Sequence, residues 1–487
     1  MNSSLPRCLW SGLTFVFLMA AGGCGTRSVI GQQTGQGGTS STGGMIGSGT
    51  GGQANQGDGG TPGTGGSPFP GTGGNPFPGT GGSPNTGAGG STVADGGGTC
   101  PTSTGSAGSS GSLSFGGTVD YLTHAGSMLV ALGDLNGDGK PDLAVTNYSV
   151  PPGTGGTGGS NAGTGGFATG GTPGTTQGSL SVFLSATGGY GPPQSYSVGT
   201  NPWSTVVGDL NGDGKADVAV VNDQGVSVFF NSGSGTLLPP VSFATGTGPV
   251  WVAIGDLNGD GKADLAVANR GAPNGSELVG GDVAVLLNMG GGTFVAANYP
   301  AGASPISVAM ADLNGDGKAD LAVASGAGVS VLLNNGNGTF GAPASYGSGT
   351  NPFSVAAGDL NGDGKLDLAV GGTDRASVLL NLGNGTFAAA VNYSYAATPY
   401  NGSGLVVIGD LNGDGRPDLA GNTLTDPCSA VAVLLNQGNG VFGAPSYVPA
   451  SNSSPSSVTL GDLNGDGKLD LVVPNGDGVA VLLNTTP

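Results

Sequence analysis

The sequence predicts an all-β protein: a seven-bladed β-propeller whose blades are four-stranded antiparallel sheets. Three observations lead to this prediction. The string Gly-Asp-Leu-Asn-Gly-Asp-Gly-Lys-x-Asp-Leu-Ala-Val occurs seven times with few changes. Each copy lies among short apolar runs separated by Gly, Asn and Asp, which is typical of strands joined by tight turns. The last copy lacks the residues for a complete unit, and a matching segment precedes the first copy.

The spacing of the motif defines the repeat. Successive copies are 75, 47, 56, 47, 51 and 52 residues apart. The first spacing contains a Gly- and Thr-rich insert, residues 151–178, which we expect to be a disordered loop. Without this insert every spacing is close to about 50 residues, a period that indicates a repeat architecture. The copies begin at Asp134, Asp209, Asp256, Asp312, Asp359, Asp410 and Asp462.

The fourth unit shows the strands expected in every unit. Residues 307–310 precede its Asp motif, residues 321–324 follow it, and residues 329–333 form a third apolar run. Asn337-Gly338 then gives a preferred hairpin turn, after which a fourth strand follows. A single sheet of this kind would leave both faces uncovered, whereas radial stacking buries each face on a neighbouring blade.

The two ends of the propeller region are expected to close the ring. The last unit ends with its third strand, residues 479–483, a few residues before the C-terminus. Residues 113–121 resemble the fourth strand of the third unit, residues 293–299. We therefore expect the propeller to span residues 112–487, with residues 112–121 completing the seventh blade.

The Asp motif predicts cation sites. Three carboxylates, one Asn amide oxygen and one main-chain carbonyl at position 7 form an all-oxygen donor set, which suits Ca²⁺. The motif contains no His or Cys, so zinc and copper are disfavoured. We expect up to seven structural Ca²⁺ ions. The expected ligands are Asp134, Asn136, Asp138, Asp142, Asp209, Asn211, Asp213, Asp217, Asp256, Asn258, Asp260, Asp264, Asp312, Asn314, Asp316, Asp320, Asp359, Asn361, Asp363, Asp367, Asp410, Asn412, Asp414, Asp418, Asp462, Asn464, Asp466 and Asp470.

The motif begins like an EF-hand loop but ends differently. An EF-hand requires a Glu at position 12 that binds calcium through both oxygens. The first four copies have Val145, Val220, Val267 and Val323 at that position, inside an apolar run. The sequence therefore favours a calcium loop between two strands over an EF-hand or dockerin loop.

The charge of the chain is concentrated in these loops. The formal net charge is −19, and 21 of the 29 Asp residues lie in the seven motifs. Seven divalent cations, with 14 positive charges, would change the net charge to −5. A protein this acidic, with only 11 Lys and Arg, does not present a nucleic-acid-binding surface.

The N-terminal region indicates export. Arg7 precedes an apolar stretch over residues 9–20, and small residues then lead to Cys24, as in a secretory signal peptide over residues 1–23. The Cys after small residues resembles the bacterial lipobox, which would make Cys24 the site of lipidation. A plainly cleaved signal is the alternative. We expect a protein anchored by its lipid to the cell envelope, preferably on the outer surface.

A low-complexity segment separates this anchor from the repeats. Residues 24–111 consist mainly of Gly, Thr, Ser and Pro, a composition that cannot bury a core, so we expect a disordered tether. Cys100 and Cys428 remain as candidates for a disulfide, which an exported protein permits. Whether they pair depends on a geometry that the sequence leaves open.

Two strings in the repeat region resemble a known family. Residues 340–343 and 442–445 both read Phe-Gly-Ala-Pro, and with the Asp loops they resemble the FG-GAP/VCBS repeats of integrin α-subunit propellers and many bacterial surface proteins. The resemblance implies calcium loops between the first and second strands on one face of the propeller, with ligands meeting the opposite face. Integrin propellers carry calcium in only some blades, whereas all seven motifs here keep the full donor set.

The resemblance favours a binding or adhesion module for a protein or glycan ligand, acting as a monomer. Aromatic and basic residues near the expected ligand face are candidate contacts, although the aromatic residues could instead pack between blades. A polysaccharide lyase or hydrolase is a second hypothesis, but the single His124 and Glu277 lie in different units and offer no catalytic pair. A structural surface protein without a specific ligand is a third. The candidate contacts are Trp203, Trp251, Phe353, Tyr400, Arg270 and Arg375.

Overall fold

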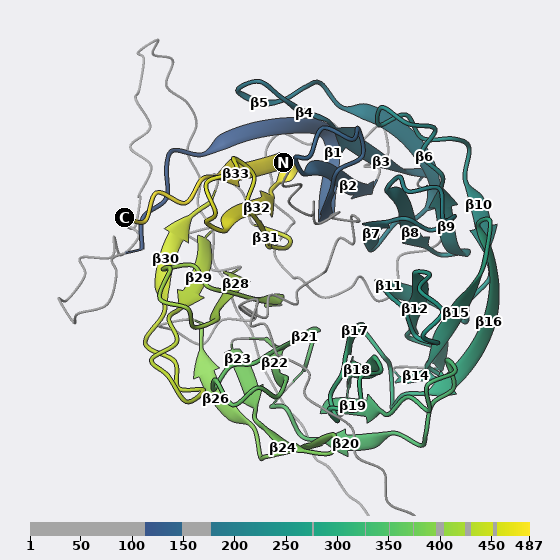
Figure 1. Cartoon of the computed structure of the whole chain (residues 1–487), viewed down its shortest axis with the longest axis vertical. Helices are drawn as coiled ribbons and strands as arrows, with labels where there is room; N and C mark the ends of the chain where they lie inside the picture. The colour runs from purple at the N-terminus through teal and green to yellow at the C-terminus, as the bar shows by residue number, and fades with distance from the viewer. Residues whose placement is uncertain are drawn as a thin grey trace, which may run out of the picture. The chain divides into compact units, whose positions relative to one another are not determined.

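Seven four-stranded antiparallel sheets surround a central axis (Figure 1). The computed structural model describes residues 113–148, 177–274, 277–326, 328–349, 351–373, 375–395, 404–423, 430–450 and 455–487. Every regular element in these residues is a strand. The predicted seven-bladed propeller is therefore confirmed. The predicted signal peptide, the tether, Cys24, Cys100, Cys428 and Tyr400 lie outside the described residues.

Five blades are each formed by one continuous segment of chain, with the first strand innermost. Blade 2 contains β7 (Thr205–Gly208), β8 (Asp217–Asn222), β9 (Gly225–Phe229) and β10 (Val241–Phe243). Blade 3 contains β11 (Pro249–Gly255), β12 (Asp264–Asn269), β15 (Asp282–Gly290) and β16 (Thr293–Pro300). Blade 4 contains β17 (Ser307–Ala311), β18 (Asp320–Ser325), β19 (Gly328–Leu332) and β20 (Ala344–Tyr346). Blade 5 contains β21 (Ser354–Gly358), β22 (Asp367–Gly371), β23 (Arg375–Leu379) and β26 (Val391–Ser394). Blade 6 contains β27 (Val406–Gly409), β28 (Asp418–Thr423), β29 (Ala430–Leu434) and β30 (Ser446–Pro449).

The other two blades share the long strand β1 (Val119–Gly133). Blade 1 contains the second part of β1, β2 (Asp142–Tyr148), β3 (Gln177–Phe183) and β6 (Gln194–Thr200). Blade 7 contains β31 (Thr459–Gly461), β32 (Asp470–Pro474), β33 (Gly476–Leu482) and the first part of β1. Gln177 and Gly178 belong to β3, so the insert expected over residues 151–178 ends before them; its residues 151–176 lie outside the described residues.

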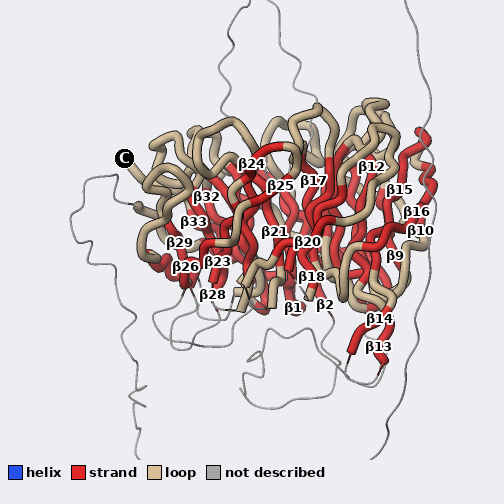
Figure 2. The backbone as a smooth tube through the Cα atoms, turned by 90° about the horizontal axis from the view of Figure 1, so that it is seen from below, coloured by secondary structure: helices blue, strands red, loops and turns tan. Residues whose placement is uncertain are grey.

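Three short hairpins extend the blades. They are β4 (Ser185–Ala186) with β5 (Gly189–Tyr190), β13 (Ala272–Asn274) with β14 (Glu277–Val279), and β24 (Asn381–Gly383) with β25 (Thr386–Phe387). The β13–β14 hairpin projects from one end of the propeller, and the β24–β25 hairpin lies toward the other end (Figure 2). The two ends of the propeller are therefore elaborated by different connections.

Strand β1 closes the ring as predicted, with one difference. Val119 pairs with Val481 and Tyr121 with Val479, so this part of β1 is the outer strand of blade 7. From Gly126 onward the same strand pairs with β2 and becomes the inner strand of blade 1. The sequence does not indicate this continuity: β1 runs without a loop through His124, between its two parts. The register of the pairing shifts between Leu122 and Ser127, which is where the strand changes partner.

The hydrophobic core is divided among the seven blade interfaces. On β12, Leu265 and Val267 pack with blade 2, whereas Ala266 and Ala268 pack with blade 4. All four are fully buried, because strands inside a propeller have no solvent-facing side. This explains the continuous apolar runs in the repeat and confirms the expected radial stacking.

A Gly precedes six of the seven Asp motifs and makes room for the neighbouring blade. A Cβ atom at Gly208 would lie 2.5 Å from Cδ1 of Ile254 on the next inner strand. Blade 4 has Ala311 at this position, and the corresponding neighbour is the small Ala357, in the same hydrophobic cluster. The one exception to Gly in the motif thus coincides with a smaller partner.

Candidate metal centres and the central channel

Each Asp motif forms the turn between the first and second strands of a blade, as the repeat predicts. In blade 2, Asp209 directly follows β7 and Asp217 begins β8. Gly212 and Gly214 have φ angles of 82° and 81°, a left-handed conformation that favours Gly. The chain turns sharply at both positions, and Oδ1 of Asp213 between them accepts a hydrogen bond from the N–H of Lys215 (3.0 Å).

The first Asp of the motif organises the loop. Oδ1 of Asp209 accepts a hydrogen bond from the main-chain N–H of Gly212 (2.7 Å), and Oδ2 accepts one from Gly214 (2.8 Å). The corresponding pair is present in all seven loops, at 2.6–2.8 Å. The seven loops therefore share one backbone conformation.

The last Asp of the motif joins its loop to the third strand of the blade. Oδ2 of Asp217 accepts from the N–H of Leu210 (3.0 Å), and Oδ1 accepts from the N–H of Asn231 (2.8 Å). Both bonds recur in all seven loops. This carboxylate is fully buried in every blade.

The electrostatic environment of these buried carboxylates is unfavourable for a negative charge. Burial, together with the nearby carboxylates of Asp213 and Asp209, raises the pKa of Asp217 to about 6, although the main-chain hydrogen bonds oppose the shift. Burial likewise raises the pKa of Asp418 to about 7. A cation at these loops would relieve both the repulsion and the burial of charge.

The basic residue of the motif does not pair with the buried Asp. Nζ of Lys215 lies 3.2 Å from Oδ2 of Asp213, at position 5, and both side chains are partly exposed. Arg416 makes the equivalent contact with Asp414 at 3.1 Å. Solvent-exposed pairs of this kind contribute little to stability. These pairs do not neutralise the buried carboxylate of the last Asp, so another positive group is needed to balance its charge.

The donor chemistry of the loops fits calcium. The described residues contain no group of three or more His, Cys, Asp or Glu side chains arranged to hold a metal ion by themselves. The motif, however, adds an Asn amide oxygen and a main-chain carbonyl to its three carboxylates. All of these are hard oxygen donors of the kind that Ca²⁺ binds, and Ca²⁺ accepts neutral oxygens among its ligands.

An Asn at or just beyond the end of the third strand recurs in six blades, a feature that was not predicted from the sequence. Nδ2 of Asn231 donates to the carbonyl of Leu135 in the preceding blade (2.6 Å) and to that of Ala216 in its own loop (2.9 Å). Its Oδ1 accepts from the N–H of Gly233. The signal in the sequence is an Asn that follows an apolar run in six of the seven units. These residues are Asn231, Asn288, Asn334, Asn381, Asn436 and Asn484.

The Phe of the Phe-Gly-Ala-Pro string also bridges neighbouring blades. The rings of Phe340 and Tyr299 meet edge to face with centroids 5.3 Å apart, and the Tyr299 hydroxyl donates to the carbonyl of Gly338. Phe442 makes the same ring contact with Tyr393. The string thus stabilises the outer part of the blade interface.

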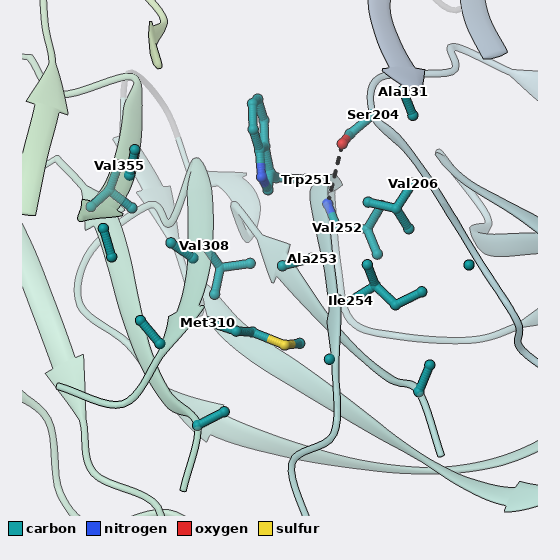
Figure 3. A pocket seen from close by; sticks show the side chains of 18 of the residues that line it. Ala131, Ser204, Val206, Trp251, Val252, Ala253, Ile254, Val308, Met310 and Val355 are labelled. Carbon is teal, nitrogen blue, oxygen red and sulfur yellow. Dashed lines mark hydrogen bonds between the residues drawn. The ribbon is translucent and has the colours of Figure 1, made fainter. Parts of the chain in front are cut away.

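A central channel of about 550 Å³ is lined by the inner strands of all seven blades. Its walls are mainly apolar, and the partly exposed side chains of Trp251, Ile254 and Met310 lie along it (Figure 3). Oγ of Ser204 accepts a hydrogen bond from the N–H of Val252, which ties two adjacent inner strands together beside the channel (Figure 3).

The structure distributes the candidate ligand contacts over several places. Trp251 lines the central channel. Trp203 and Phe353 occupy matching positions before the inner strands of blades 2 and 5, where their N–H groups donate to Val221 and Gly371. Arg270 follows β12, and Arg375 begins β23. Trp203, Phe353, Arg270 and Arg375 thus lie at strand ends that face away from the Asp loops, whereas Trp251 lies within its strand.

Comparison with protein families identifies the repeats. FG-GAP-like repeats match residues 209–267, 275–323, 312–370, 359–421 and 423–473, and an FG-GAP repeat matches residues 128–164. The matches span more than half of the chain. The chain belongs to the FG-GAP repeat family.

Three solved structures illustrate the range of similar chains. A lectin of Agrocybe aegerita that recognises non-reducing terminal N-acetylglucosamine is 22% identical, with a TM-score of 0.43, and the match covers 67% of this chain and 80% of that one. BBS1N, solved in complex with ARL6DN, is 12% identical, with a TM-score of 0.49 and coverage of 77% and 97%. The Tc holotoxin pore of Photorhabdus luminescens is 14% identical, with a TM-score of 0.33 and coverage of 72% and 18%. None of the three is similar enough to bear on function.

No curated protein sequence matches the chain significantly. The described residues include no helix with the length and apolar character needed to cross a membrane.

Proposed function

We propose that this FG-GAP propeller is a calcium-dependent binding or adhesion module for a protein or glycan. In this proposal the chain is exported and anchored to the outer surface of the cell envelope through a lipid on Cys24, as in bacterial lipoproteins. It acts as a monomer and has no catalytic role.

The observation that carries the proposal is the fully buried carboxylate at the end of each Asp motif. Around Asp217 the other charged groups of the loop that affect its pKa are carboxylates, and the nearby Lys215 pairs with Asp213 instead. Seven such sites in one domain would strongly destabilise the fold without a counter-ion.

Each loop would hold one Ca²⁺ through the side chains at positions 1, 3, 5 and 9 and the carbonyl at position 7. In blade 2 these residues are Asp209, Asn211, Asp213, Asp217 and Lys215. Bound calcium supplies positive charge to the loop and has a structural role. The loop residues themselves order the turn and fix the start of the second strand.

The ligand would be met at the end of the propeller opposite the Asp loops. The β24–β25 hairpin begins at Asn381, whose N–H donates to Asp367, so the Asp loops lie at the same end as this hairpin. The β13–β14 hairpin, next to Arg270, projects from the other end (Figure 2). Trp203, Phe353 and Arg375 would add stacking and charged contacts for a glycan or peptide.

The test is binding of the purified chain to glycan and matrix-protein arrays in calcium, in EDTA, and after calcium is restored. We expect binding that disappears in EDTA and returns with calcium. The paired variants D213N and D120N separate the loops from general charge effects, since Asp213 belongs to a loop, whereas Asp120 is exposed on the outer strand of blade 7. Turnover of a polysaccharide, or silence across both arrays in calcium, would contradict the proposal.

A further inference from the structure

Buried Asn side chains connect the Asp loops of neighbouring blades in series. Between blades 1 and 2, Oδ2 of Asp142 accepts from the N–H of Leu135 (2.8 Å), and the carbonyl of Leu135 accepts from Nδ2 of Asn231 (2.6 Å). The N–H of Asn231 in turn donates to Oδ1 of Asp217 (2.8 Å). Three hydrogen bonds through two residues thus link the buried carboxylates of two loops, Asp142 and Asp217.

The same path recurs at six of the seven blade junctions. In each case the Asn is at most 4% exposed, and its Nδ2 lies 2.6–2.9 Å from the carbonyl oxygen of the Leu in the preceding loop. The donors Asn231, Asn288, Asn334, Asn381, Asn436 and Asn484 bond to the carbonyls of Leu135, Leu210, Leu257, Leu313, Leu360 and Leu411, respectively.

The junction between blades 7 and 1 differs. Ser185 occupies the position of the Asn, and its N–H donates to Oδ1 of Asp142 as usual (2.6 Å). Its hydroxyl, however, donates to Oδ2 of Asp138 in its own loop (2.8 Å). Among the described residues the path therefore forms an open line from the first loop to the seventh.

Asn is suited to this position because one side chain satisfies three partners. Its amide nitrogen has two hydrogens and reaches two carbonyls, while its oxygen accepts the N–H two residues later. A Ser hydroxyl has a single hydrogen and cannot bridge two carbonyls. The choice of Asn or Ser thus decides whether neighbouring loops are joined.

We infer that these Asn residues couple the loops, so that calcium binding at one loop raises the calcium affinity of its neighbours. This inference rests on the calcium role proposed above. A cation that orders the last Asp of one loop also fixes the adjoining Leu and its carbonyl. That carbonyl holds the Asn, which fixes the last Asp of the next loop. A loop that is already ordered loses less conformational freedom on binding, which gives positive cooperativity.

The test is a calcium titration of the full chain after EDTA treatment, read by isothermal titration calorimetry together with the number of ions bound. We expect the unmodified chain to bind with a Hill coefficient clearly above 1. N334S copies the residue found at position 185 and divides the line into groups of three and four loops. It should bind the same number of ions with a lower Hill coefficient, with a loss of coupling between neighbouring loops on the order of fivefold or more.

Two further variants sharpen the test. S185N should join the seventh loop to the first and raise the Hill coefficient, and it removes no existing contact between blades. N335A is the matched control, because Asn335 is exposed and bonds to Thr339 within its own hairpin. It should leave the titration unchanged.

The outcomes separate the coupling from the calcium role itself. Full binding with a Hill coefficient of 1 in the unmodified chain would overturn the coupling and leave the calcium role intact. An unchanged Hill coefficient in both N334S and S185N would do the same. Failure of the unmodified chain to bind calcium would overturn both. If N334S does not fold, N288S provides the same cut at another junction.

Discussion

The fourth and seventh blades have the same architecture but are built from the chain in different ways. In blade 4 one continuous segment supplies all strands: the N–H of Gly341 donates to the carbonyl of Leu333 (2.9 Å), and Asn334 pairs with Phe340. In blade 7 the two ends of the propeller meet: the N–H of Gly116 donates to the carbonyl of Leu483 (2.8 Å).

The remaining contacts at these positions also match. Phe115 pairs with Asn484 in blade 7 as Phe340 pairs with Asn334 in blade 4. The N–H of Thr485 donates to Ser114 at 2.8 Å, which is the counterpart of a turn bond in blade 4. The register of the outer strand is thus set by contacts local to the blade and does not depend on a covalent turn. Blade 7 must still overcome the entropy of closing a loop that contains nearly the whole propeller.

Removing the closing segment should have the largest effect. Deletion of residues 113–122 removes the outer strand of blade 7, so we expect the melting temperature to fall by about 10 °C or more, with blade 7 opening first. Deletion of residues 103–112, immediately before the described segment, is the matched control. Differential scanning calorimetry measures both. Equal melting temperatures for the two deletions would show that the ring does not need this strand.

Calcium removal tests the Asp loops, which blades 4 and 7 have in common. Both contain a buried carboxylate beside other carboxylates, Asp320 and Asp470, and burial raises the pKa of both. In EDTA we expect the melting temperature to fall by several degrees, because the ligand-linked stabilisation is lost from all blades. Calcium, but not potassium, should restore it. A melt that is the same in EDTA and in calcium would count against bound calcium.

Blades 4 and 7 differ in how well the Phe at their outer edge is buried. Phe340 is 8% exposed and packs on Tyr299, whereas Phe115 is only partly buried against the cluster between blades 6 and 7. We expect F340A to lower the free energy of unfolding by about 3–5 kcal/mol and F115A by less. Chemical denaturation of both variants in calcium measures the difference. A larger loss for F115A would show that the contact between the two ends of the propeller contributes more to stability than the burial of Phe115 indicates.

A smaller effect is expected at the exceptional inner-strand position of blade 4. A357I places a large side chain against Ala311, where other interfaces have Gly, so we expect a loss of about 1–3 kcal/mol. The double variant A311G/A357I should recover part of this loss, because the pair then resembles Gly208 and Ile254. If A311G gives no recovery in a double-mutant cycle, the two positions do not compensate each other.

The repetition of the sequence explains why so much of the fold could be predicted. Seven copies of one motif gave the blade number, the strand order and the seven loops, and the missing outer strand of blade 7 gave the closure. The FG-GAP strings gave the family. The repeats could not predict the point at which β1 changes its pairing partner, because the stretch around His124 has no counterpart in the other units.

The contacts between blades were harder to predict. Asn334 bonds to Leu257 in another blade, 77 residues away, and no local pattern indicates that partner. The match between Ala311 and Ala357 likewise depends on side chains that meet only in the ring. Trp251, a candidate ligand contact, lies along the channel, because its position on β11 is one residue later than that of Trp203 on its blade.

Calcium binding by the seven Asp loops can be measured directly. The most direct measurement is the number of calcium ions retained per chain after EDTA treatment, reloading with calcium and extensive dialysis, determined by atomic emission. We expect several ions, up to seven, and one fewer in D213N than in D120N. A chain that retains no calcium, or an unchanged number in D213N, would show that the Asp loops do not hold calcium.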